Sequence, residues 1–188
     1  MSAVVNYTTQ NELLLNNLLE FYKDENNLKN MLRIITGESK ISLRIVDWFA
    51  TNYAKKNYTL YQITNKNGDN IRFKVYFDYK LKLKAYSKKR FDPFCRWERI
   101  SIPYKDGTCI ETTIGQLNFF KWALENGVIN YIEENYDIIE KDMNCRNSTS
   151  KRKENAENSK TRKKREELSI SATKSMKKEE VEIVVKFN

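Results

Sequence analysis

Lysine and arginine are the side chains that gather closely enough in this sequence to define a binding chemistry. The formal net charge is +9 and its distribution is uneven: residues 72–105 hold eleven Lys/Arg and three Asp/Glu, residues 144–188 hold thirteen and seven, and residues 106–143 hold two and eight. A surface that only needs to keep a protein soluble intersperses both signs. Two basic regions with an acidic one between them therefore indicate a polyanionic partner, and we expect nucleic acid.

The first basic region supplies cations suited to contacts with phosphate groups. Tyrosines stand among them at positions 76 and 86, and aromatic rings stack on bases while cations neutralise the phosphate backbone. The candidate ligands in this region are Arg72, Lys74, Lys80, Lys82, Lys84, Lys88, Lys89 and Arg90.

The second basic region contains two short clusters of candidate ligands. The first is Lys151, Arg152 and Lys153, and the second is Arg162, Lys163, Lys164 and Arg165. Such clusters on a disordered segment act as a phosphate-binding arm or as a nuclear-localisation-type signal. The alternative is a solvated tail whose charges only keep the protein soluble.

Groups that support catalysis or hold a cofactor are scarce. The sequence has no histidine, the commonest general base near neutral pH and the commonest transition-metal ligand, and it has no Cys-x-x-Cys pair or glycine-rich phosphate loop. Cys95 has cationic neighbours but no histidine to activate it. The adjacent Glu133 and Glu134 fit the solvated face of a helix better than acid–base work. We therefore expect no enzymatic activity, no metal and no cofactor.

The sequence carries no pattern typical of membrane or secreted proteins. No run approaches the eighteen or so apolar residues that span a bilayer, and residues 1–9 lack the basic and apolar regions of a signal peptide. The three cysteines are odd in number and not closely paired, which predicts no disulfide framework. We expect an intracellular protein without a membrane partner.

The elements that must position the cations begin with helices. Apolar side chains recur every three or four residues over 12–22, 27–36 and 42–55, which predicts three helices with buried stripes. Thr113 and Gln116 have the spacing of a capping box that opens a fourth helix. A last helix is predicted over 128–143, with its acidic residues on the outer face.

The first group of cations falls on a segment with strict alternation. Every odd position from Ile71 to Ala85 is apolar, and five of the even positions are Lys or Arg. Alternation is typical of a half-buried strand, so we predict a long strand after residues 58–64 and a hairpin loop. Its exposed face would present cations and tyrosines together. The alternative is an ordinary solvated sheet face, or an edge strand protected by lysines.

These elements predict an α+β fold of N-terminal helices, a small antiparallel sheet of hairpins, two further helices and a disordered basic tail. A second hairpin is predicted over 99–112. Residues 1–143 would form one globular domain. Residues 144–178 would be disordered, because no large apolar residue occurs between positions 144 and 167. Residues 179–188 are β-prone and would pair either with the chain's own sheet or with a partner's.

Three segments of the sequence are distinctive enough to indicate a family: residues 41–49 (ISLRIVDWF), residues 88–96 (KKRFDPFCR) and residues 112–120 (TTIGQLNFF). Together with residues 162–169 (RKKREELS), they resemble an uncharacterised family of small proteins encoded by giant nucleocytoplasmic large DNA viruses, mimivirus-like and klosneuvirus-like. The resemblance extends over nearly the whole chain and supplies no catalytic or binding residues. It implies a viral setting, either a factory in the host cytoplasm or the virion, with nuclear entry left open.

The leading hypothesis is a non-catalytic viral accessory protein that binds DNA or RNA electrostatically, in genome packaging or late gene expression. The alternative is a structural virion or assembly protein, such as a minor capsid component, whose tail and β-prone segment tether a viral protein partner. Attraction to a membrane surface has no amphipathic basic helix to support it. The oligomeric state stays open.

Overall fold

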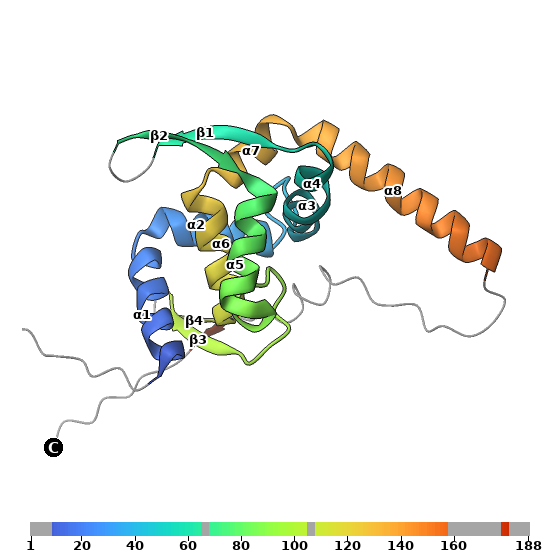
Figure 1. The fold of residues 1–188 in the computed structure, drawn as a ribbon. Coiled ribbons are helices and arrows are strands. Elements are labelled where there is room, and N and C mark those ends of the chain that lie inside the picture. The colour runs from blue at the N-terminus through green and yellow to red at the C-terminus, as the bar shows by residue number, and fades with distance from the viewer. Residues whose placement is uncertain (1–8, 65–67, 105–107, 158–177, 181–188) are drawn as a thin grey trace, which may run out of the picture.

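The computed structural model describes residues 9–64, 68–104, 108–157 and 178–180, with 147–157 and 178–180 described by their backbone (Figure 1). The fold is a mixture of helices and small antiparallel sheets, so the α+β prediction is confirmed. In chain order the helices are α1 (Gln10–Tyr22), α2 (Glu25–Ile35), α3 (Leu43–Trp48), the π-helical turn η1 (Phe49–Tyr53), α4 (Ala54–Lys56), α5 (Val75–Arg90), α6 (Ile114–Glu125), α7 (Val128–Glu134) and α8 (Tyr136–Glu157). The strands are β1 (Leu60–Thr64), β2 (Asn70–Lys74), β3 (Ile100–Pro103), β4 (Thr108–Thr112) and β5 (Lys178–Glu180).

Side chains cap the first turns of the N-terminal helices. Thr9 and Glu12 form a reciprocal capping box at α1, and the Asp24 and Ser42 side chains cap α2 and α3. The third predicted helix continues through η1, whose backbone hydrogen bonds span one residue more than those of an α-helix. Phe49 and Ala50 are buried there. Such single π-turns often occur at functional sites.

Helix α6 forms the centre of the core. Most of its length is buried, and it packs against α1 and α5. Phe119 and Trp122 of α6 contact Phe91 and Tyr79, with ring centroids 5.4–6.5 Å apart. A Cβ at Gly115 would lie 3.0 Å from the carbonyl oxygen of Lys89, so the absence of a side chain there allows α6 to approach the end of α5 closely.

Both predicted hairpins are present. Strands β1 and β2 pair antiparallel, with residue 60 opposite 74 and 62 opposite 72. Strands β3 and β4 pair with residue 102 opposite 110. Strand β5 adds to the other side of β4 (Thr108 opposite Glu180), so this part of the β-prone segment pairs with the chain's own sheet; residues 181–188 lie outside the described residues.

The prediction of a strand over 71–85 is wrong after Lys74. Residues 75–90 form helix α5, whose regular turns end at Ser87 (φ 60°). Leu, Lys and Ala favour helix at exposed positions, and a helix buries Val75 and Tyr79, four residues apart, against the core. The alternating pattern also leaves Phe77 and Leu81 on the outside of the helix, 57% and 65% exposed. Packing against α6 therefore decides the structure, and the alternation does not.

The last predicted helix is divided and longer than expected. Asn135 separates α7 from α8, and α8 continues to Glu157. Residues 144–157 of the predicted disordered tail are therefore helical. Figure 1 shows α8 passing α3 and α4 and then extending beyond the rest of the described chain. None of the helices in the described ranges combines the length and apolarity needed to cross a membrane.

Candidate nucleic-acid interface

The β1–β2 hairpin places two of the candidate cations on one exposed face. Arg72 lies opposite Gln62 and Lys74 opposite Leu60, and all four side chains are exposed. Residues directly opposite one another in an antiparallel pair project to the same side. The other face carries Phe73, which is buried. The hairpin therefore turns its apolar face to the core and its cations to solvent, as expected for these two positions.

Helix α5 places a second pair of cations on its outer face. Lys80 and Lys84 are exposed and four residues apart, a spacing that brings side chains together on one side of a helix. Phe77 and Leu81 flank them. We call Lys80 and Lys84 the α5 basic stripe.

Lys82 and the two tyrosines do not join this stripe. Lys82 and Tyr86 are partly buried and line a hollow between α5, α1 and α6, and the Tyr86 ring stacks on Phe91 (centroids 6.3 Å apart). Tyr76 is partly buried near Lys55. The predicted single platform is therefore wrong, because consecutive helical residues are about 100° apart and even positions do not share a face.

Lys88, Lys89 and Arg90 lie at the end of α5, remote in sequence from the hairpin. Arg90 donates a hydrogen bond to the Gln10 side chain (3.4 Å), and its carbonyl accepts one from Asn118 (2.8 Å). Arg90 therefore combines a structural role with its positive charge, whereas Lys88 and Lys89 are exposed.

The cations of residues 72–90 lack negative partners. The segment contains eight Lys/Arg and one carboxylate, that of Asp78, and Asp78 accepts a hydrogen bond from the indole of Trp122 (2.6 Å). In the described part of the chain none of the eight is ion-paired with a carboxylate, whereas cations elsewhere, such as Lys56 and Arg96, are. The charge of Lys88 acts on a carboxyl at longer range, because it opposes the rise in the pKa of Asp92 that burial causes. A concentrated positive field is left on β2 and α5.

The structure describes only part of the second basic region. Lys151, Arg152 and Lys153 belong to α8, so the backbone that carries them is helical. Arg162, Lys163, Lys164 and Arg165 lie outside the described residues. Their role as ligands stays a prediction.

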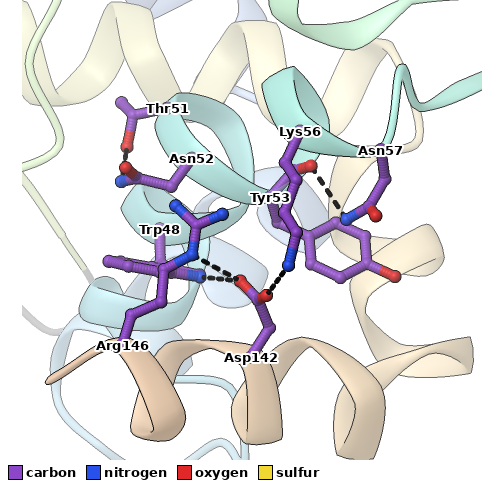
Figure 2. Close-up of polar contacts among 8 residues, drawn as sticks. All are labelled: Trp48, Thr51, Asn52, Tyr53, Lys56, Asn57, Asp142 and Arg146. Carbon is purple, nitrogen blue, oxygen red and sulfur yellow. Dashed lines mark hydrogen bonds and ion pairs between the residues drawn. The ribbon is translucent and has the colours of Figure 1, made fainter. Parts of the chain in front are cut away.

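A partly buried polar contact, which the sequence did not reveal, fixes α8 to the rest of the described chain. Figure 2 shows the Asp142 carboxylate accepting hydrogen bonds from the Trp48 indole (3.1 Å) and the Lys56 ammonium (3.0 Å), with the Arg146 guanidinium 3.8 Å away. Partial burial acts to raise the pKa of Asp142, but the hydrogen bonds and positive charges outweigh it and hold the pKa below its usual value. The spacing of Asp142 and Arg146 is a recognisable helical ion pair, but nothing in the sequence identifies Trp48 as a partner 94 positions away.

A second missed cluster contains Asp47, Asp92 and Arg96. Arg96 binds Asp92 through two nitrogens, with Nε 3.0 Å from Oδ2. Burial raises the pKa of Asp92 in spite of this ion pair. Burial and the charge of Asp92 raise the pKa of Asp47 to about 6, and Arg96 opposes the change. Groups of three or more Asp, Glu or Cys suited to a metal ion are absent from the described residues.

Comparison with known proteins places the chain in a viral context. Residues 2–186 match the model of a family of unknown function, DUF7197. The chain is similar to uncharacterized protein L507 of Acanthamoeba polyphaga mimivirus, with 47% identity over 144 residues. That alignment covers 74% of this chain and 54% of the relative, so the chain spans about half of the relative's length. No solved structure matches the chain. The expected likeness to a giant-virus family is confirmed, and because the family model covers nearly the whole sequence, this protein belongs to the DUF7197 family.

Proposed function

We propose that this protein is a non-catalytic viral accessory protein that binds nucleic acid through its phosphate groups, in genome packaging or late gene expression. The observation that carries the proposal is the excess of cations over residues 72–90, eight against one carboxylate, with no ion pair among the described residues to neutralise them. A polyanion that binds there releases its condensed counterions, which is the main source of sequence-independent affinity.

The contact surface consists of two parts, the exposed face of the β1–β2 hairpin and the α5 basic stripe. Arg72 and Lys74 lie on the hairpin face, and β2 leads directly into α5. The stripe residues are one helical turn apart, about 5–6 Å between Cβ atoms. Neighbouring phosphates of one strand can therefore be contacted together. Phosphate contacts position a protein on nucleic acid without reading its sequence, so little base preference is expected from this surface.

Charge reversal on the stripe tests the proposal. The variant Lys80→Glu/Lys84→Glu should lose affinity for a single-stranded and a double-stranded probe in a shift assay with the full chain. The matched control is Lys29→Glu/Arg33→Glu on α2, where two exposed cations have the same spacing and the change in net charge is identical. Equal loss of affinity in both variants, or none in either, would contradict a localised interface.

The second candidate function is a structural or assembly role in the virion. It is favoured by the apolar side chain of Leu81, which is 65% exposed between the two stripe lysines, because a large exposed apolar side chain in a patch is typical of a protein contact. In that case Leu81→Ser should impair incorporation into particles while nucleic-acid affinity is retained. Loss of nucleic-acid affinity in the charge-reversed variant with normal incorporation would favour the first function.

A further inference from the structure

A hollow of about 510 Å³ opens where α4 ends, β1 begins and α5 begins. Its wall is largely aromatic and aliphatic: Tyr58, Leu60, Tyr76 and Phe77 all line it. Tyr58, Leu60 and Phe77 are 75%, 54% and 57% exposed. Large apolar side chains gathered on an open concave surface are typical of a binding site.

The backbone holds the Tyr58 ring at this surface in an unusual way. Tyr58 has φ 47°, in the left-handed region that bulky residues rarely adopt. The next residue is fixed on both sides: the Thr59 N–H donates to the Ala54 carbonyl (3.1 Å), and the Thr59 carbonyl accepts from the Val75 N–H (3.3 Å). The loop that presents the ring is therefore tied to both α4 and α5 before any ligand arrives.

The charge around the hollow is positive. Lys55 and Lys74 line it and no carboxylate does; the Lys55 ammonium lies 5.6 Å from the centroid of the Tyr76 ring. Helix α5 starts at this point, and no side chain caps its first turn. The first amide of α5, that of Val75, donates to the Thr59 carbonyl. The next amides of the first turn have no acceptor within the helix, and with the helix dipole they favour an anion.

One polar group of the wall is left unsatisfied. Thr59 is 7% exposed and lines the hollow, and its hydroxyl oxygen has no hydrogen-bond partner among the described residues. Buried hydroxyl groups are nearly always hydrogen-bonded. The wall thus offers one polar position between an aromatic surface and two cations.

A ligand that fits these features has a flat aromatic face, a polar edge and an anionic group attached to it. We infer that the hollow holds one unpaired nucleotide of a nucleic-acid strand, with its base against Tyr58 and Phe77 and its phosphate at Lys55 and Lys74. The inference rests on the proposed function and deepens it, because Lys74 belongs both to the hollow and to the hairpin face. A strand that leaves the hollow meets Arg72 on one side and the α5 basic stripe on the other.

Two single-residue variants of the full chain test the inference. Tyr58→Gly removes the ring and suits the left-handed backbone, and Phe77→Ala removes an exposed ring without opening the core. Stacking contributes a factor of about 5–150 in affinity for each base, so each variant should bind a single-stranded oligonucleotide more weakly by a factor in this range. Affinity for a fully paired duplex should not change, because its bases are already stacked. The matched control is Trp97→Ala, which removes an exposed aromatic side chain outside the hollow.

Photo-crosslinking locates the bound base independently of affinity. Irradiation of the wild-type complex with a single-stranded oligonucleotide that contains 5-iodouracil should join the base to Tyr58, Tyr76 or Phe77. The inference would be overturned by crosslinks only at other residues. It would also be overturned if the Tyr58, Phe77 and Trp97 variants bound a single strand as tightly as the wild type. Salt-dependent binding by the wild type would still support the proposed function in either case. A wild-type protein that binds no oligonucleotide overturns both.

Discussion

Among single residues, Asp47 has an unusual environment for a carboxyl group. Its carboxyl is partly buried near the Asp92 carboxylate, and the charge of Arg96 opposes their effect on its pKa. The pKa rises from 3.8 to about 6 in the folded protein, so between about pH 4 and pH 6 the folded chain holds a proton that the unfolded chain has released. Since the folded state binds more protons in this window, the free energy of unfolding falls as the pH rises through it.

Replacing this carboxyl should stabilise the protein at neutral pH. Asp47→Asn removes a charge that is buried at an energetic cost, and the free energy of unfolding at pH 7 should rise by about 1–3 kcal/mol. The decrease in stability between pH 4 and pH 6 should also become smaller. Urea denaturation at a series of pH values measures both effects. A lower free energy of unfolding at pH 7 in the variant would contradict this prediction, because it would show that contacts stabilise the Asp47 carboxylate in the folded protein.

Contacts and environments of single residues were the features that the sequence predicted least well. The cations were identifiable from composition. The environment of Asp47 was not, because it depends on the folding of residues 91–96 back onto α3, and burial rather than residue type raises the pKa.

At the scale of elements, local sequence patterns predicted the helices and strands whose residues favour a single type of secondary structure. The Thr113 cap of α6 and the strand pairs of both hairpins depend on residues close together in the sequence, and they are where the pattern places them. Residues 75–86 have an alternating pattern but a composition compatible with helix. Their structure depends on Trp122, whose indole binds Asp78, and on the close approach allowed by Gly115. Both lie in α6, and no local pattern contains that information.

Helix α8 is attached to the domain by an interaction that can be tested at this scale. Asp142→Asn removes the negative charge that faces Lys56, Arg146 and the Trp48 indole. The free energy of unfolding should fall by about 1–3 kcal/mol, because a partly buried ion pair loses its negative partner. Amide hydrogen exchange over residues 136–146 should increase in the same variant.

The control for this variant lies one turn of α8 earlier. Asp137 pairs with Lys40 at 3.4 Å, but its side chain is 90% exposed, and pairs of this kind contribute little to stability. Asp137→Asn should therefore leave both the free energy of unfolding and the exchange unchanged. If both variants behave alike, Asp142 does not anchor the helix.

At the scale of the whole molecule, the chain separates its charges between elements. The positive charge of residues 72–90 lies on β2 and α5, while much of the negative charge follows residue 106, on α6, α7 and α8. Figure 1 shows where these elements lie. The composition predicted this separation, but it did not predict its shape, which is a hairpin face joined to a helical stripe. A field of this kind raises the rate of encounter with a polyanion and weakens as salt is added.

The dependence of nucleic-acid affinity on salt is the sharpest test of an electrostatic interface on β2 and α5. For the full-length protein, the logarithm of the binding constant should fall linearly with the logarithm of the salt concentration. Each phosphate contact contributes about 0.7 to the slope for a single strand and about 0.9 for a duplex. Lys80→Glu/Lys84→Glu should make the slope less steep by about two such contributions, and Lys29→Glu/Arg33→Glu should leave it unchanged. A binding constant that is independent of salt, or a slope that both variants reduce equally, would contradict an electrostatic interface on β2 and α5.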